Sequence, residues 1–449
     1  MSKYDYDLIV IGAGAGGLNA SLEGFALGKN VLLVEKFRPG GECTWSGCIP
    51  SKALIQIADD IHIAKKYTTL QVDTKNVMNK VRQLTQTTHE GESVEVLENE
   101  GINYLNGFAT FVDNHTVEVN GEKITATNII ISTGSSALIP NLSGLNTVDY
   151  LTNENIFQLE ELPKSLIVLG GGAIGVELSQ AMARLGVSVT LIEMADSILF
   201  REDNEAVDLL TNILKKEEIK IITGAKGTEV KNVNNRVELT LEIGGNQEIV
   251  DAERILIALG RKANLENINL EQIGIEKTDR AIIVNEYMQT NIPNIYAVGD
   301  IAGPYLFSHM GAAQGRTAVR HMYNPTNNSA MTKDYAWTTF THPELARTGF
   351  TEKEAREKYG ENIRIYKTNY SSSDRAVVDE KSHGLAKVIC NSEGKIIGAS
   401  ILGERAGELL GEIQLLKLFD QPFYKLSEAI HPYPTYSEVL TSLSRDAKE

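Results

Sequence analysis

Cysteine is scarce in this sequence, with three cysteines among 449 residues. Three cysteines are too few for the disulfide framework of a small secreted domain. Long apolar runs are also missing, since none reaches the roughly 18 residues that a membrane span requires. The chain opens with Lys3, Asp5 and Asp7, and the apolar run that follows at 8–11 is too short for a signal peptide. We therefore expect a cytoplasmic protein.

Positive charge is in deficit. Lys and Arg number 43 against 59 Asp and Glu, which gives a formal net charge of −16 and a pI of about 5.1. A surface of this sign repels phosphate groups, so we expect neither nucleic acid nor a membrane as a partner. The remaining composition is that of an ordinary globular protein, with 42% hydrophobic residues. At roughly 150 residues per domain, the length predicts about three domains.

Glycine is abundant, at 38 residues, and its placement reveals a duplicated unit. The unit is an apolar strand, a Gly-x-Gly-x-x-Gly turn, a helix-like stretch, and a second apolar strand that ends on a carboxylate. The strands are predicted at 8–11 and 31–34 in one copy, and at 166–169 and 187–192 in the other. The copies lie 158 positions apart and contain Gly12, Gly14, Gly17 and Glu35, then Gly170, Gly172, Gly175 and Glu193.

Each unit has the parts of a dinucleotide-binding turn. The first glycine forms the tight turn, the second lets the backbone approach a pyrophosphate, and the third lets the helix pack closely on the strand. The carboxylate, Glu35 or Glu193, is placed to accept hydrogen bonds from ribose hydroxyls. The alternative, two glycine-rich turns without a ligand, does not explain why both copies carry every part. Two such sites predict two dinucleotides, which favours a flavoprotein reduced by a nicotinamide.

Other strand-and-turn segments extend this interpretation. Residues 129–133 followed by Gly134, and residues 255–259 followed by Gly260, are predicted to close the two domains. A further strand from residue 295 ends at Gly299-Asp300, where the carboxylate suits the ribityl chain of a flavin, unless it is an ordinary turn aspartate. The last 115 or so residues change character: a hairpin at 384–391 and 395–402 and an amphipathic helix at 406–419 predict an α+β module without a dinucleotide signature.

Two of the cysteines, Cys43 and Cys48, lie five positions apart, which is neither redox nor metal CxxC spacing. Five residues of regular helix rise ~7.5 Å, whereas a disulfide needs Cα atoms within about 6.8 Å. A bridge therefore requires a distorted segment, which Gly47 and Pro50 would permit. We expect a helix from about 50 to 67 with Cys48 at its N-terminus, where the helix dipole stabilises a thiolate. The alternative is two unbridged core cysteines, and Cys390 is expected to be an inert buried thiol.

The motifs together resemble the pyridine nucleotide–disulfide oxidoreductases, a family that includes dihydrolipoyl dehydrogenase, glutathione reductase and mercuric reductase. The resemblance spans the chain and includes Cys43-x4-Cys48-Ile-Pro-Ser-Lys52 and His431-Pro-Tyr433-Pro434-Thr-Tyr-Ser-Glu438. It implies an α/β fold with two Rossmann-like dinucleotide-binding domains, for FAD and NAD, plus a C-terminal α+β dimerisation domain, in a homodimer. The expected FAD domain is 1–142 with 263–330, the NAD(P) domain 143–262, and the interface domain 331–449.

The resemblance also implies roles for individual residues. Cys43 attacks the substrate, Cys48 exchanges electrons with the flavin, and Lys52 lies near the flavin and pairs with Glu177. Glu193 repels a 2′-phosphate and favours NADH over NADPH. The expected cofactor-binding residues are Gly12, Gly14, Gly17, Glu35, Lys36, Gly41, Lys52, Thr133, Gly134, Gly170, Gly172, Ile174, Gly175, Glu193, Gly260, Gly299 and Asp300.

The C-terminal motif departs from the family. Disulfide reductases carry a histidine that pairs with a glutamate as acid/base across the dimer interface, whereas this chain has Tyr433 at that position, with Glu438 and the other histidine, His431, retained. A tyrosine of pKa about 10 is a poor base at neutral pH. Tyrosine near the cysteine pair resembles mercuric reductase, although this chain ends without that enzyme's vicinal cysteines. Trp45, between Cys43 and Cys48, either shapes the substrate pocket or packs against the FAD domain.

Three functions follow. The favoured one is reduction of a disulfide or a thiol-bound metal, in which the metal is the substrate and no metal cofactor is expected. The second is a dihydrolipoyl dehydrogenase that uses His431 or water in place of the missing base. The third is a flavin oxidase or diaphorase in which the cysteines are bystanders.

Overall fold

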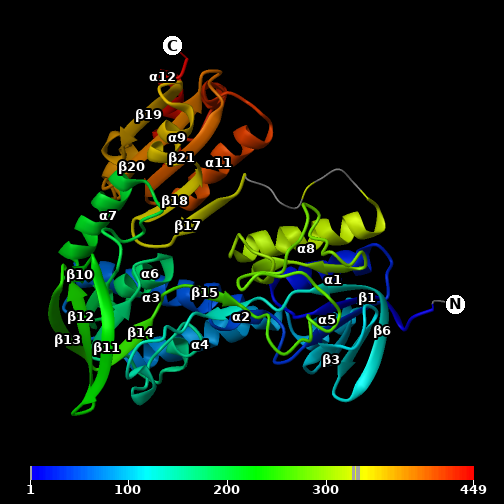
Figure 1. Cartoon of the computed structure of the whole chain (residues 1–449). Coiled ribbons are helices and arrows are strands. Elements are labelled where there is room, and N and C mark those ends of the chain that lie inside the picture. The colour runs from blue at the N-terminus through cyan, green and yellow to red at the C-terminus, as the bar shows by residue number, and fades with distance from the viewer. Residues whose placement is uncertain (1–2, 326–328, 330–333, 449) are drawn as a thin grey trace.

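The computed structural model describes residues 3–325, 329 and 334–448. The expected boundary at 330/331 between the FAD and interface domains falls outside these residues. The described strands form five sheets. A seven-stranded sheet belongs to the N-terminal unit, a four-stranded and a three-stranded sheet to the second unit, and a five-stranded sheet to the C-terminal unit, while a two-stranded sheet joins the first two units (Figure 1). No helix in the described ranges is both long and apolar enough to cross a membrane.

The N-terminal unit is built on a seven-stranded sheet. Six of its strands have the order β3-β2-β1-β6-β5-β4, and the seventh, β16, pairs with β6. Strand β1 runs parallel to β2 and β6, and it is central because its last four residues are buried apolar side chains. The strands are β1 (Tyr6–Ile11), β2 (Val31–Glu35), β3 (Asn103–Asn106), β4 (Ala109–Phe111), β5 (Thr116–Val119), β6 (Glu122–Ile131) and β16 (Ile295–Ala297).

The first glycine turn leads into a helix of this unit, and the two cysteines lie on two further helices. Helix α1 packs against α8, which comes from far along the chain (Figure 1). The helices are α1 (Ala15–Ala26), α2 (Gly41–Trp45), α3 (Cys48–Lys65), α4 (Thr74–Glu90), α5 (Val94–Asn99), α8 (Ser308–Tyr323) and the 3-10 helix η3 (Gly299–Ile301).

The second unit repeats the first, as the duplicated pattern predicted. Its parallel sheet has the order β10-β9-β8-β14, and a three-stranded antiparallel sheet, β11-β12-β13, lies beside it. The elements are β8 (Ser165–Leu169), α6 (Ala173–Arg184), β9 (Ser188–Ile192), α7 (Asn204–Lys216), β10 (Lys220–Ile222), β11 (Ala225–Val233), β12 (Arg236–Ile243), β13 (Asn246–Ala252) and β14 (Arg254–Ile257). Strands β7 (Ser135–Ala137) and β15 (Arg261–Ala263) pair where the chain crosses between the units, and η1 (Leu145–Thr147) and η2 (Ile156–Gln158) follow β7.

The C-terminal unit is an antiparallel sheet of order β17-β18-β21-β20-β19 with helices around it. The predicted hairpin and helix are confirmed as β20, β21 and α11. The elements are β17 (Ala336–Thr339), β18 (Glu344–Gly349), α9 (Glu352–Tyr359), β19 (Ile363–Asn369), η4 (Tyr370–Ser372), α10 (Asp374–Val378), β20 (Leu385–Asn391), β21 (Ile396–Gly403), α11 (Ala406–Leu418), η5 (Phe423–Glu428) and α12 (Glu438–Asp446).

Two neighbouring lysines on this sheet form ion pairs with acidic residues at the N-terminal end of α7. Lys387 on β20 is 4% exposed, and its ammonium lies 3.0 Å from Asp203, which is 3% exposed, and 2.9 Å from Glu352. Its neighbour across the β19–β20 ladder, Lys367, contacts Glu205 at 2.7 Å. Burial opposes the charge of Lys387, but the hydrogen bonds to Glu352 and Asp203 raise its pKa. These ion pairs fix the second unit against the C-terminal sheet.

Candidate functional site

One large cavity, of about 3270 Å³, runs between the three units. Both glycine turns, both strand-end carboxylates, the two cysteines and Asp300 line it. Segments more than 250 residues apart in sequence therefore open into one space. The remaining expected cofactor-binding residues that line it are Lys36, Gly41, Lys52, Thr133, Gly134, Ile174, Gly260 and Gly299.

The glycine turns have the geometry that the sequence pattern requires. Gly12 and Gly170 have φ of +103° and +118°, a region that side-chain-bearing residues rarely adopt. A Cβ on Gly17 or Gly175 would lie 1.8 or 1.9 Å from the carbonyl oxygen of the first glycine of its turn, so these third glycines allow the helix to pack on the strand. They do not line the cavity, in contrast to the first two glycines of each turn.

The helices that follow the turns begin without side-chain caps. Neither α1, after Gly14, nor α6, after Gly172, has a capping side chain or an acidic residue in its first turn. Their first backbone N–H groups are therefore free to bind an anion. A Cβ on Gly172 would meet nothing within 4 Å, and one on Gly14 would meet only the Cα of Gly41 at 4.0 Å. This open approach to two uncapped helix ends fits the pyrophosphates of FAD and of a nicotinamide dinucleotide.

The cysteines lie on two helices separated by a break in the chain. Helix α2 ends at Trp45, Ser46 and Gly47 follow, and α3 begins at Cys48. The break at Gly47 was expected, but Pro50 does not contribute to it. Proline is accepted within the first helical turn because N–H groups there have no intrahelical partner. Helix α3 therefore starts two residues earlier than predicted, and Cys48 occupies its N-terminus.

Cys43 and Cys48 lie close together and are unbridged in this structure, with their side chains hydrogen-bonded to each other. The hydrogen bond from the Cys43 thiol, with smaller contributions from Ser308 and Lys52, lowers the pKa of Cys48 to about 6. The same hydrogen bond, together with burial, raises the pKa of Cys43. Cys48 is therefore the more acidic of the two thiols. Cys390, by contrast, is buried, and burial raises its pKa to about 12.

Lys52 and Glu177 form an ion pair between the two dinucleotide-binding units. The distance from Lys52 Nζ to Glu177 Oε2 is 2.7 Å, and the glutamate side chain is 7% exposed. The other carboxylate oxygen accepts a hydrogen bond from the backbone N–H of Phe340 at 2.9 Å. Lys52 lies one helical turn after Cys48, so its charge faces the thiolate as well.

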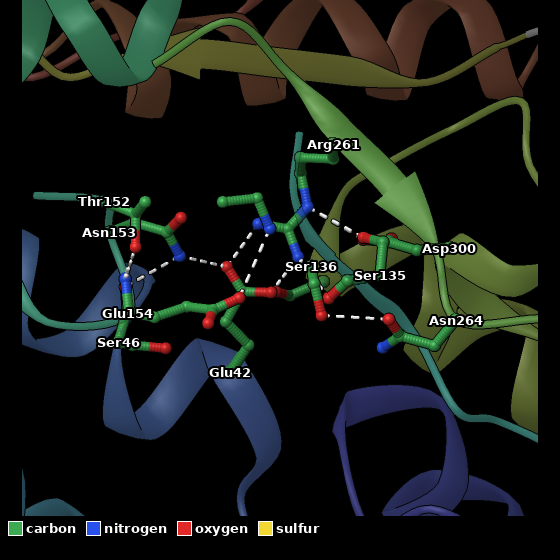
Figure 2. Close-up of polar contacts among 12 residues, drawn as sticks. Glu42, Ser46, Ser135, Ser136, Thr152, Asn153, Glu154, Arg261, Asn264 and Asp300 are labelled. Atoms are coloured by element: carbon green, nitrogen blue, oxygen red, sulfur yellow. Dashed lines mark hydrogen bonds and ion pairs between the residues drawn. The ribbon is translucent and has the colours of Figure 1, made fainter. Parts of the chain in front are cut away.

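Asp300 lies in a polar network that the sequence did not indicate (Figure 2). Its carboxylate accepts a 2.5 Å hydrogen bond from Ser135, and the Arg261 guanidinium lies 3.3 Å away. Arg261 also binds both carboxylate oxygens of Glu42.

Ser308, whose hydroxyl lies 3.4 Å from the Cys48 sulfur, was likewise missed. The available signals were local: Arg261 follows Gly260, Glu42 precedes Cys43, and Ser308 begins the helix after Gly299-Asp300.

The predicted acid/base residues of the C-terminus lie outside the cavity of their own chain. The Tyr433 side chain is 74% exposed, and its hydroxyl donates to Asp374 at 2.9 Å. This hydrogen bond raises the pKa of Tyr433. Glu438 accepts a hydrogen bond from Ser373 at 3.0 Å, so it does not pair with the tyrosine.

His431 has a carboxylate partner that the sequence did not reveal. Its Nε2 lies 3.0 Å from Glu412 Oε2, on a helix that packs behind the C-terminal segment. Since Glu412 is 19 positions earlier in the chain, no local spacing points to this pair.

Trp45 packs against the N-terminal unit. The guanidinium of Arg38 lies 3.1 Å above its ring, His89 lies 4.3 Å away by ring centroids, and the indole N–H donates to the carbonyl of Pro39 at 2.8 Å. These contacts favour the packing role of Trp45, although part of the ring also lines the cavity.

Sequence models of one family cover nearly the whole chain. The model described as "Pyridine nucleotide-disulphide oxidoreductase" matches residues 6–322, and that of its dimerisation domain matches residues 335–444. A mercuric reductase of Bacillus cereus is 32% identical over 98% of this chain and 71% of its own length. A dihydrolipoyl dehydrogenase of Thermus scotoductus is 37% identical over 97% and 96%.

Solved structures agree with this assignment. The HOCl-induced flavoprotein disulfide reductase RclA from Escherichia coli superposes with a TM-score of 0.89 at 28% identity, and the match covers 98% of this chain and 99% of that one. A Cu(II) complex of RclA gives the same TM-score at 26% identity, covering 99% of each chain. The chain therefore belongs to the pyridine nucleotide-disulphide oxidoreductases, FAD-dependent enzymes that use NAD(P) and act on sulfur groups or metal ions.

Proposed function

We propose that this enzyme takes electrons from NADH and, through the Cys43–Cys48 pair, reduces a disulfide or a thiol-bound metal ion. The observation that carries the proposal is the placement of the pair: Cys48, with its lowered pKa, and Cys43, with its raised pKa, lie in the same cavity as two open dinucleotide turns. If the cysteines were bystanders, one thiol of lowered pKa beside one of raised pKa would have no purpose. Bound FAD would supply the chemistry that accepts a hydride from the nicotinamide and delivers two electrons to the cysteine disulfide.

The protein residues then have defined parts. Glu35 and Asp300 hold the ribose and ribityl hydroxyls of FAD, and Glu193 holds a ribose of the nicotinamide nucleotide. Lys52 supplies positive charge beside the cysteines, and Glu177 keeps that ammonium in place. The first two glycines of each turn, which line the cavity, let the backbone bind the pyrophosphates.

A disulfide substrate would be reduced by two successive thiol–disulfide exchanges. Cys43 loses its proton and attacks one substrate sulfur, which forms a mixed disulfide and releases the other half as a thiolate. The Cys48 thiolate then attacks the Cys43 sulfur, which restores the protein disulfide and releases the second half of the substrate. The two thiolates take up two protons, and the substrate has gained two electrons. A metal ion would instead be bound by the two sulfurs. As the protein disulfide re-forms, the two thiols release their protons and pass two electrons to the metal, enough for one Hg(II) or two Cu(II) ions.

Tyr433 favours a metal ion as the electron acceptor. Reduction of an unactivated disulfide needs a base to deprotonate Cys43 and an acid to protonate the leaving thiolate. A phenol with a raised pKa serves poorly as the base, whereas thiolates bind a soft metal ion without it. The mercuric reductase relatives and the Cu(II) complex of RclA support this class of substrate.

A dihydrolipoyl dehydrogenase is the second candidate, and the His431–Glu412 pair is the observation that favours it. A histidine with a carboxylate partner 3.0 Å away has the composition of an acid/base pair. In this case the His431→Ala variant would lose lipoamide turnover, and the wild-type enzyme would prefer lipoamide to metal ions.

Three further assignments belong to the proposal. Glu193 supports NADH over NADPH because a carboxylate at the adenosine ribose repels a 2′-phosphate. The division into 1–142 with 263–330, 143–262 and 331–449 is supported by the sheets: β16 joins the seven-stranded sheet of the first segment, the four-stranded and three-stranded sheets lie within the second domain, and the five-stranded sheet lies within the third. A homodimer is supported by exposed apolar side chains of the C-terminal unit, which include Leu418 at 74%, Phe419 at 66% and Ile430 at 100%.

The test is to reduce the yellow protein anaerobically with NADH and then to offer Hg(II), Cu(II), lipoamide, glutathione disulfide and quinones. We expect a long-wavelength thiolate–flavin absorption on reduction, and metal turnover that Cys43→Ser and Cys48→Ser each abolish. Unchanged turnover in both variants would instead identify a diaphorase, and a preference for lipoamide would identify the second candidate.

A further inference from the structure

One guanidinium lies between two carboxylates that, like it, line the cavity (Figure 2). Arg261, at the start of β15, donates from its two terminal nitrogens to the two oxygens of Glu42. Its Nε lies 3.3 Å from Asp300. The three residues come from three distant segments, so the arginine joins α2 to the turn after β16.

The arrangement is closed by Ser135 on the neighbouring strand β7. Its hydroxyl accepts from Arg261 Nε at 2.8 Å and donates to Asp300 at 2.5 Å, and its carbonyl accepts from Arg261 Nη2 at 2.9 Å. The side chains of Arg261, Glu42 and Asp300 are 13%, 26% and 20% exposed. In so enclosed a place, loss of the guanidinium would leave two carboxylates without neutralisation.

Glu42 is also the residue immediately before Cys43. Helix α2 has five residues, and a helix of that length depends on contacts with its surroundings for its position. On one side these are the hydrogen bond from Thr44 to Glu92, 2.7 Å long, and the packing of Trp45. On the side of Asp300, Glu42 makes the contacts, with Arg261 and with Asn153.

We propose that Arg261 is a positioning residue. It fixes the position of α2, and with it Cys43, relative to the carboxylate of Asp300. One side chain thereby sets the placement of both the redox pair and the flavin-binding aspartate. The inference rests on the proposed function for the role of Asp300, while its effect on the cysteines follows from the contacts of Glu42. It predicts that loosening α2 lowers the effective concentration of Cys43 beside Cys48 and so disfavours their disulfide.

The experiment measures the Cys43–Cys48 disulfide in equilibrium with glutathione in the purified FAD-containing protein. Samples in anaerobic glutathione buffers are quenched with acid and alkylated, and the oxidised fraction is read by mass spectrometry. We expect Glu42→Gln and Arg261→Gln each to lower the equilibrium constant for disulfide formation at least tenfold, which is about 30 mV in potential. The double variant should fall no further than the larger single effect, because both variants break the same contact.

Two further measurements separate positioning from general damage. Arg261→Gln should also weaken FAD retention, whereas Glu42→Gln should leave it within twofold of wild type. Lys262→Gln, which removes an exposed charge from the same strand, should alter neither quantity. If Arg261→Gln does not fold, Glu42→Gln alone decides. An unchanged equilibrium constant in folded Glu42→Gln would overturn the inference, and since neither NADH nor an acceptor takes part, that result is independent of the enzyme's substrate.

Discussion

Glu35 and Glu193 hold their glycine turns in the same way, although 158 residues separate them. One oxygen of each carboxylate accepts a hydrogen bond from the backbone N–H of the residue after the first glycine, Ala13 or Gly171, at 2.7 Å. The other oxygen of each carboxylate accepts a hydrogen bond from the backbone N–H two positions after the glutamate itself. This distance is 2.9 Å from Phe37 and 2.8 Å from Ala195. The duplication therefore conserves the hydrogen bonds of the turn as well as its glycines.

Because Glu35 and Glu193 have the same geometry but are proposed to bind different nucleotides, replacing each should impair the binding of a different cofactor. Glu35→Ala should reduce the FAD that copurifies with the protein, while Glu193→Ala should retain FAD and raise the KM for NADH about tenfold, the effect of losing one or two hydrogen bonds to a charged group. The ratio of flavin to protein absorbance and steady-state kinetics check the two effects. Equal loss of FAD in both variants would show that the carboxylates only support the fold of their turns.

Ser308 is predicted to tune the acidity of Cys48. Ser308→Ala removes a hydroxyl 3.4 Å from the sulfur and should raise the pKa of Cys48 by about one pH unit, the equivalent of one hydrogen bond to a charged group. Because the pKa of Cys48 is lowered to about 6, its thiolate forms as pH rises through that value. The stability that this shift contributes is complete above the ordinary thiol range and is lost as pH falls through about 6.

The measurement is the pH profile of thiolate absorbance and of alkylation by iodoacetamide in the reduced protein. Ser51→Ala is the matched control, since that hydroxyl donates to the carbonyl of Cys48 and not to its sulfur. A shift of equal size in both variants would mean that the start of α3 responds to any loss of a hydroxyl.

The buried ion pairs between the second unit and the C-terminal sheet lead to a stability prediction. Lys387→Met leaves Asp203 buried without its cation and should reduce the free energy of unfolding by about 3–5 kcal/mol. Lys367→Met, one strand away, removes a charge whose side chain is 47% exposed and should cost at most about 1 kcal/mol. Denaturant unfolding of both variants checks the difference, and equal losses would contradict the importance of burial.

The sequence was sufficient for the parts of the fold that depend on local pattern. The glycine turns, their strands and carboxylates follow from residue types at fixed spacing, because a tight turn with positive φ accepts little but glycine. The hairpin at 384–391 and 395–402 was predicted from two strand-like runs around a Ser-Glu-Gly turn, and the following helix from amphipathicity. The helix start at Cys48 was placed two residues late because proline was taken as its boundary.

The contacts between distant segments could not be read from spacing. Arg261 reaches Glu42 across 219 positions, and Lys387 reaches Asp203 across 184. Nothing local distinguishes these charges from the solvated charges around them, and only the packing of the units brings them together. The hydrogen bond from Tyr433 to Asp374, 59 positions earlier in the chain, is of the same kind.

Tyr433 is predicted to set the choice of acceptor. Tyr433→His places a base with a pKa near 6.5 where the family's disulfide reductases have one, and general acid–base catalysis contributes about 10²–10⁴-fold. We expect that variant to gain at least tenfold in turnover of lipoamide or glutathione disulfide and to keep its metal turnover within twofold. Tyr433→Phe should not gain disulfide turnover, because it cannot transfer a proton. Steady-state kinetics of the three proteins with each acceptor check this, and a Tyr433→His enzyme with an unchanged acceptor profile would mean that this segment does not reach the cysteines of the partner subunit.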